Sequence, residues 1–213
     1  MTDVDVFVDP SCPWSWTTSR WIKEVAPQRD LRVTWRSYSC EIRDEYRPPR
    51  AVSEGFRERV VQAHAVGHRL LRIFEATRDR SGEHGVDALY AEWGSRYFGG
   101  DPTSRHTPFA ECLQASGLDP ELVEAADDAA WDAAIVASME GAHVFGGPKT
   151  QTPTVAVRSD PPHGFRGPVM SPAPTGEAAR RLWDAIMVVS AEPGFFELTR
   201  PRPDVPATGH PTG

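Results

Sequence analysis

The stretch that most constrains the fold of this 213-residue chain is Asp9–Trp16, with the sequence DPSCPWSW. It follows Val4–Val8, whose alternating and then continuous apolar pattern predicts a strand with at least one buried face. Pro13 suits the first turn of a helix, where its missing amide donor costs nothing, and this helix is expected to run to about Val25. The pattern therefore places Cys12 at a strand-to-helix turn.

The elements that follow predict an α/β fold. Leu31–Trp35 alternates as a second strand, and a right-handed crossover would make it parallel to the first. Near the other end, Thr154–Val157 and Phe165–Met170 are close enough to form an antiparallel hairpin. An amphipathic helix over Thr175–Ser190 ends the order, with Ala178, Leu182, Ile186 and Val189 on its apolar side. Apart from the residues in between, this is the minimal thioredoxin order, β-α-β followed by β-β-α.

The intervening segment is predicted to be helical throughout. Helices are expected at Val52–Arg80, Gly85–Phe98, Pro108–Ala115, Pro120–Ala126 and Asp128–Val144. A block of this size between short strands indicates an inserted subdomain and not a loop. We therefore expect a thioredoxin-like domain in two parts, 1–47 and 148–200, a helical insertion over 48–147, and a proline-rich flexible tail over 201–213.

The charge balance of the chain limits its partners. The formal net charge is −7, which argues against a nucleic-acid partner, because phosphate binding needs clustered lysine and arginine. No apolar run approaches the length that spans a membrane, and no secretory signal is visible. We therefore expect a cytoplasmic, reducing location. The oligomeric state stays open, with a homodimer among the alternatives.

Cys12 is the strongest candidate for chemistry. At a helix N-terminus a thiolate faces unpaired amide donors and the positive end of the helix dipole, so the pKa of Cys12 is expected to be lowered. Ser15 could donate a hydrogen bond to the sulfur, but it cannot resolve a mixed disulfide. The structural alternative is that Cys12 is a small buried apolar residue.

Thr152 and Pro153 form the second part of the predicted site. A proline directly before a strand cannot donate to the hydrogen-bond ladder and marks a special turn. Most X-Pro bonds are trans, so the two residues alone do not predict a cis bond here. A cis conformation is expected only if the fold requires it.

These features together resemble a known superfamily. The Cys12–Ser15 sequence CPWS after a strand, Thr152-Pro153 before a strand, and helices between them resemble the DsbA superfamily. The C-terminal third, with FRGPV at Phe165–Val169, LWD at Leu182–Asp184 and PGFFEL at Pro193–Leu198, resembles the actinobacterial mycothiol-dependent nitroreductases. The resemblance implies a DsbA-like thioredoxin fold in which Pro153 is cis and faces Cys12. It also implies mycothiol, or a similar low-molecular-weight thiol, as the cofactor.

The motif departs from the CPWC of well-known members, because Ser15 stands in place of the second cysteine. The chain would therefore act as a monothiol, and an external thiol would resolve a mixed disulfide on Cys12. We expect reduction of a small electrophilic or aromatic substrate. One alternative is a thiol-dependent transferase or isomerase, since the related kappa-class glutathione transferases use a serine at this position. Such an enzyme could act in secondary metabolism. Another is a binding protein without catalysis.

The remaining cysteines are weaker candidates. An odd count of three is not a disulfide framework. Cys40 follows the second strand and could resolve Cys12 only if the two Cα atoms lay within about 7 Å, so packing or lining of the cleft is preferred. Core packing is also preferred for Cys112, and no metal is expected.

Several other side chains are expected near the site because of where their elements end. His64 and His68 share a helix face, but no third ligand for a metal is evident, and the pair is expected either to cover the site or to lie on an exposed face. Trp14 could stack on an aromatic substrate or cap the core. The predicted set that binds substrate or thiol is Pro13, Trp14, Tyr38, His64, His68, Thr152 and Pro153, with Arg43 and Tyr46 as further lining residues.

Overall fold

The structure, a computed structural model, describes residues 1–46, 53–99 and 108–208, and a four-stranded sheet lies at its centre. The strands are β1 (Thr2–Val8), β2 (Leu31–Ser37), β3 (Thr154–Val157) and β4 (His163–Arg166), in the order β2-β1-β3-β4. β1 pairs in parallel with β2 and antiparallel with β3. The central position of β1 fits its apolar run, since both faces of its second half are buried.

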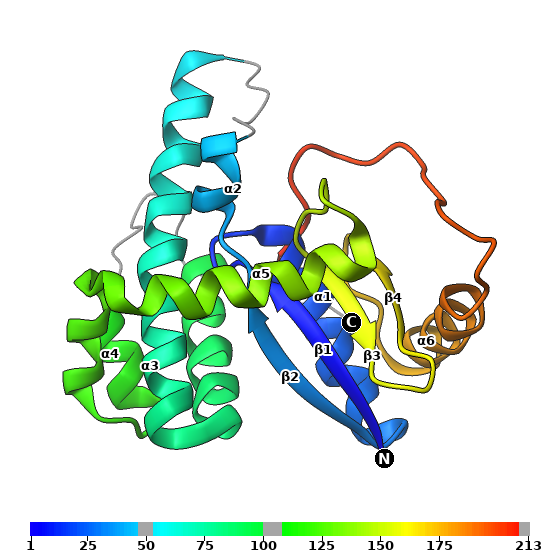
Figure 1. Cartoon of the computed structure of the whole chain (residues 1–213), viewed down its shortest axis with the longest axis horizontal. Helices are drawn as coiled ribbons and strands as arrows, with labels where there is room; N and C mark the ends of the chain where they lie inside the picture. Colours follow the sequence, from blue (N-terminus) through cyan, green and yellow to red (C-terminus); the bar gives the residue numbers. More distant parts are fainter. Residues whose placement is uncertain (47–52, 100–107, 209–213) are drawn as a thin grey trace.

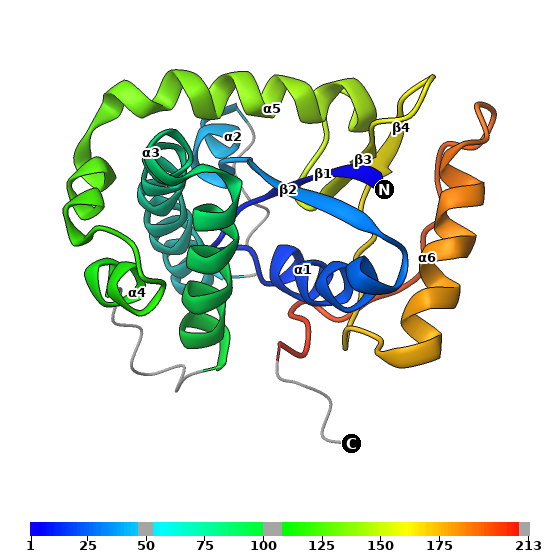
Figure 2. The same ribbon diagram turned by 90° about the horizontal axis from the view of Figure 1, so that it is seen from below.

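Helices cover both faces of the sheet, as Figure 2 shows. α1 (Pro13–Val25) and α6 (Gly176–Ser190) lie on one side, and α5 (Asp132–Gly146) crosses the other. The predicted β-α-β unit, hairpin and final helix are thus confirmed. None of the helices in the described residues is long and apolar enough to cross a membrane.

The segment between β2 and β3 is helical, as expected (Figure 1). It holds α2 (Cys40–Tyr46), α3 (Glu54–Gly99) and α4 (Phe109–Ala115), then the 3₁₀ helices η2 (Pro120–Asp127) and η3 (Ala129–Trp131) before α5. The backbone of α3 is non-helical at Gly82, where φ is 71°, so the two predicted helices meet near the expected place. The α-helix expected over 120–126 is a 3₁₀ helix, and α2 was not predicted.

The bounds of the second hairpin strand were predicted wrongly. β4 covers His163–Arg166 and not Phe165–Met170. The strand stops because Gly167 adopts a φ of 103° and Pro168 has no amide to donate. The amide of Gly167 instead donates to the carbonyl of Pro153, at 2.8 Å, which fixes the end of β4 beside the start of β3.

The buried face of α6 was predicted only in part: Leu182 and Ile186 pack against the core, but the fully buried residues lie one position later than predicted. Ala179 and Trp183 are buried, whereas Ala178 and Val189 are exposed. The indole of Trp21 on α1 donates to the carbonyl of Ala179 at 3.0 Å, so a close approach of the two helices decides which side of α6 turns inward.

The first turns of α3 are less buried than the rest of the helix. Val61 is 51% exposed, because the first turns of α3 extend beyond the sheet (Figure 1). Farther along, the helix is buried through Leu70, Leu71 and Phe74.

A C-terminal strap, residues 191–208, runs without regular structure from the end of α6 back toward the start of α1 (Figure 1). Pro206 is buried, the amide of Ala207 donates to Ser171 Oγ at 2.7 Å, and the hydroxyl of Thr208 donates to the carbonyl of Phe98 at 3.3 Å. Residues 201–208 of the expected flexible tail thus make specific contacts with the rest of the protein. The domain boundaries expected near 47 and 147 stay predictions, and Pro48 and Pro49 lie outside the described residues.

Candidate active site

Cys12 occupies the N-cap position of α1, with Pro13 as the first helical residue. Its own backbone is extended (φ −81°, ψ 114°), and its carbonyl accepts from the amide of Trp16 at 3.1 Å. The amide of Cys12 donates to the carbonyl of Asp9 at 3.0 Å, which closes the turn between β1 and the helix. The position that the sequence predicts for Cys12 is therefore the observed one.

The side chain of Asp9, which was not predicted as a site residue, stabilises this turn through hydrogen bonds. It is fully buried and accepts from the amide of Ser11 at 2.7 Å, from the hydroxyl of Ser11 at 2.6 Å and from the amide of Cys40 at 2.7 Å. A Cβ atom at Gly67 would lie 2.4 Å from Asp9 Oδ1, so only glycine lets α3 come this close. The feature of the sequence that could have indicated this role is an aspartate at the end of a buried strand.

Thr152 connects Ser15 with the Cys12 turn. The Thr152–Pro153 peptide bond is cis, and the carbonyl of Thr152 accepts from the Cys12 thiol at 3.9 Å. The hydroxyls of Ser15 and Thr152 are 2.5 Å apart, and the hydroxyl of Thr152 also contacts the carbonyl of Phe7 at 3.0 Å. Three of the predicted site residues, Cys12, Ser15 and Thr152, are thus brought together by segments almost 140 residues apart.

The electrostatic environment of Cys12 differs from the expected one. Burial raises the pKa of the Cys12 thiol, and the negative charge of Asp9 raises it further. Hydrogen bonds from Ser15 and from the amide of Trp14 act in the opposite direction but do not compensate. The expectation of a lowered pKa is wrong here, because the cost of desolvating the anion exceeds the gain from the helix N-terminus.

Cys40 and Cys112 are buried, and all three cysteines are free. Burial, aided by the charge of Asp9, raises the pKa of Cys40 well above its usual range, and burial raises the pKa of Cys112 to about 11. Cys112 packs in the hydrophobic core as expected. Cys40 lies beneath the Cys12 turn, since its amide binds Asp9.

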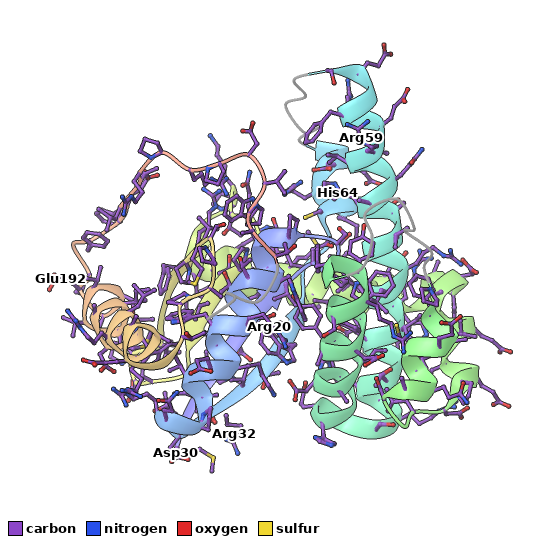
Figure 3. The ribbon with its side chains drawn as sticks, turned by 180° about the vertical axis from the view of Figure 1, so that it is seen from behind. Arg20, Asp30, Arg32, Arg59, His64 and Glu192 are labelled. Atoms are coloured by element: carbon purple, nitrogen blue, oxygen red, sulfur yellow. The ribbon has the colours of Figure 1, made fainter. Side chains whose placement is uncertain are left out.

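His64 and His68 bind groups on neighbouring segments, and Figure 3 labels His64. Nδ1 of His64 is 2.5 Å from Asp44 Oδ2 on α2. His68 contacts Ser39 Oγ through Nδ1 at 3.0 Å and Asp132 Oδ1 through Nε2 at 3.1 Å. These contacts hold α3 against α2 and α5. Among the described residues, no group of three or more His, Cys, Asp or Glu side chains is placed to hold a metal ion.

The predicted lining residues have mixed positions. Trp14 is partly exposed, and the guanidinium of Arg202 lies 4.5 Å from its ring centroid. Tyr38 is buried and its hydroxyl donates to the carbonyl of Thr150 at 2.7 Å. Arg43 is paired with Asp44, and the side chain of Tyr46 lies outside what the structure describes. Contact of Arg202 with Trp14 was not predicted, and nothing in the proline-rich tail signals it.

Comparison with known proteins gives a family. The profile described as Rv2466c-like, mycothiol-dependent nitroreductase Rv2466c, matches residues 11–200. An uncharacterized protein of Mycobacterium tuberculosis, Rv2286c, is 28% identical over 207 residues, which cover 95% of this chain and 83% of that protein.

Solved structures show the same fold. A probable DsbA oxidoreductase from Streptomyces coelicolor, SCO1869, is similar with a TM-score of 0.56 at 20% identity, over 99% of this chain and all of that one. The cytosolic disulfide reductase DsbM from Pseudomonas aeruginosa, solved with GSH, gives a TM-score of 0.55 at 14% identity, over 87% of this chain and 99% of that one. The predicted DsbA-like thioredoxin fold with a helical insertion is therefore confirmed.

Proposed function

This chain belongs to the Rv2466c-like family of mycothiol-dependent nitroreductases, and from this premise we propose a monothiol oxidoreductase that reduces a small electrophilic or aromatic substrate. The observation that carries the proposal is the contact of the Cys12 thiol with the carbonyl of Thr152 at the start of α1, with Ser15 where a second cysteine would stand. Cys12 is the nucleophile, and the resolving thiol comes from outside the chain.

The residues around Cys12 fit an external thiol. Cys12 and Trp14 are both partly exposed residues, so a small molecule can approach the first turn of α1 and rest on the indole. Cys40 and Cys112 are buried, which leaves Cys12 as the accessible thiol of the structure. Mycothiol would supply the second thiol, and with it the electrons that Ser15 cannot provide. Pro13 and Pro153 shape the two turns between which the substrate would approach.

The hydroxyls of Ser15 and Thr152 can support the ionised form of Cys12. The Thr152 hydroxyl has one proton, which it donates either to the carbonyl of Phe7 or to Ser15 Oγ. In the second arrangement the proton of Ser15 is free to point at the Cys12 sulfur. Loss of the thiol proton would therefore be matched by a shift in the hydrogen bonds of these two hydroxyls.

The experiment that tests this proposal is intact-protein mass spectrometry after incubation with the disulfide of mycothiol. The Cys12 thiolate displaces one mycothiol thiolate and retains the other half as a mixed disulfide. We expect one adduct on the wild-type protein and none on C12S. In S15C the adduct should be lost again, because the new thiol displaces it and closes an internal disulfide. Absence of an adduct on Cys12 in the wild-type protein would overturn the proposal.

We propose a cytoplasmic location for the reaction, since thiol chemistry that relies on a low-molecular-weight reductant needs a reducing compartment. The three free cysteines of the structure are consistent with such a compartment.

The raised pKa of Cys12 favours a second candidate, a thiol-dependent transferase or isomerase. In that case the external thiol itself adds to the substrate, with Ser15 stabilising it, and no net electron transfer occurs. Product analysis separates the two: the second candidate consumes no reductant and keeps its activity in C12S. A protein that binds the thiol without turnover in either assay would be a binding protein.

A further inference from the structure

Three arginines from separate parts of the chain gather around the Cys12 site. Arg166 is the last residue of β4 and pairs with Thr154 in the sheet register. Its guanidinium donates to Gln151 Oε1 at 2.7 Å. Since Gln151 directly precedes Thr152, Arg166 lies beside the loop whose carbonyl contacts the Cys12 thiol.

The second arginine comes from the C-terminal strap. Arg202 lies over the ring of Trp14, 4.5 Å from its centroid, and Trp14 is two residues beyond Cys12. Arg43, the third, is on α2, where it is paired with Asp44. Burial lowers the pKa of the Arg166 guanidinium, and repulsion from the positive charges of Arg202 and Arg43 lowers it further. Arg166 and Arg202 thus lie beside the two segments that meet at the Cys12 thiol, the loop before Pro153 and the first turn of α1.

Among the described residues, Arg166 and Arg202 belong to the arginines that no aspartate or glutamate holds, and they combine this with a place beside the Cys12 turn. Arg32 and Arg72 are each held by an aspartate at 2.6 Å. By contrast, no carboxylate lies within ion-pair distance of Arg166 or Arg202 in the ranges 1–46, 53–99 and 108–208. Glu197 on the strap acts on Arg166 only through longer-range attraction. Two guanidiniums without a counter-charge, in a protein of net charge −7, form a local site for an anion.

The shape of a guanidinium limits which anions fit. Its planar set of donors matches a carboxylate or a phosphate in a two-point hydrogen-bonded pair. Mycothiol, an N-acetylcysteinyl pseudodisaccharide, has no carboxylate to place there. The arginines therefore face the other reactant.

We propose that Arg166 and Arg202 bind a carboxylate of the electrophilic substrate, so that the substrate class is a small aromatic carboxylate. This inference rests on the proposed function, because it assigns the second reactant of the same site. Trp14 would lie against the aromatic ring while the two arginines hold the acid group.

A matched pair of aromatic disulfides tests the inference. The anionic probe is 5,5′-dithiobis(2-nitrobenzoate), and the neutral probe is 4,4′-dithiodipyridine. With each, the Cys12 thiolate attacks one sulfur, the S–S bond breaks, and a coloured thiolate or thione leaves, so the rate is read by absorbance. Mass spectrometry confirms that Cys12 is the residue modified, and C12S gives the background.

The variant R166Q/R202Q removes both guanidiniums, and R180Q/R181Q on the outer part of α6 removes the same total charge elsewhere. We expect R166Q/R202Q to react at least about tenfold more slowly with the anionic probe and at the wild-type rate with the neutral one. R180Q/R181Q should match the wild type with both. The advantage of the anionic probe should also diminish as salt is raised.

Equal rates of R166Q/R202Q and wild type with the anionic probe would overturn the carboxylate site, as would an equal loss with both probes. If wild-type Cys12 reacts with neither probe, the proposed monothiol function itself fails. The two failures are therefore distinguishable.

Discussion

At the scale of single residues, the chemistry of this protein depends on how Cys12 is ionised. Its sulfur lies at a helix N-terminus, yet burial and the nearby carboxylate of Asp9 raise its pKa. In this position Asp9 fixes the turn through three hydrogen bonds. The same side chain therefore builds the site and opposes the thiolate within it.

The rate at which iodoacetamide alkylates Cys12 should accordingly keep rising with pH beyond the range in which an ordinary cysteine is fully ionised. S15A removes a side-chain hydroxyl that lowers the pKa of Cys12, so it should move the midpoint further upward. Alkylation at neutral pH should slow by roughly three- to tenfold, which corresponds to the loss of about 1 kcal/mol of hydrogen-bond stabilisation of the thiolate. Mass spectrometry with C12S as the background measures this. A midpoint below that of free cysteine would contradict the raised pKa.

At the scale of elements, the position of α3 against α1 is set by glycine. A Cβ atom at Gly94 would lie 2.0 Å from Cζ3 of Trp16, whose ring is buried and stacks on Phe98 with a centroid distance of 5.8 Å. Trp16 therefore belongs to the core that joins the insertion to the thioredoxin-like part, whereas Trp14, two residues earlier, is partly exposed toward the strap.

Replacement of Gly94 by alanine should lower the free energy of unfolding by about 1–3 kcal/mol, because the Trp16 ring must move within a packed core. G55A in the first turn of the same helix is the control: its nearest neighbour is 3.8 Å away, and it should be neutral or slightly stabilising. Urea unfolding followed by circular dichroism measures both. Equal stability of G94A and wild type would show that the two helices are not in this close contact.

At the scale of the whole molecule, ion pairs connect segments that are distant in the sequence. Asp132 at the start of α5 accepts from Arg72 on α3, and this contact lowers the pKa of Asp132. Arg29 and Arg32 similarly lower the pKa of Asp184 and Asp3. A carboxylate with a lowered pKa in the folded state stabilises it at any pH above the unfolded value of about 4.

This stabilisation should be lost as the pH falls from about 4 through the lower pKa values of the folded state. The urea midpoint is therefore expected to be nearly constant from pH 7 to 5 and to fall steeply below pH 4. D132N should lose part of this acid dependence, since its side chain does not titrate, and be less stable than wild type at pH 7. A stability that rises as the pH is lowered below 4 would contradict the argument.

Much of the fold follows from local patterns. The two strands of the β-α-β unit, the helix from Pro13 to Val25 and the break near Gly82 are all visible in the sequence, because strand and helix periodicity and the backbone preferences of proline and glycine act over a few residues. The wrong end of β4 and the shifted face of α6 have the opposite origin. Both were decided by contacts with partners elsewhere, the carbonyl of Pro153 and the indole of Trp21.

The sequence by itself determined that Cys12 stands at a strand-to-helix turn with Ser15 in the second position of the motif, since these are properties of adjacent residues. Only the tertiary structure decided that the Cys12 thiol is buried enough to raise its pKa, that Asp9 lies beneath it, and that Arg166 and Arg202 are near the same site. Burial and charge depend on atoms that the fold brings together from β4, α2 and the strap, and no local pattern encodes their distances.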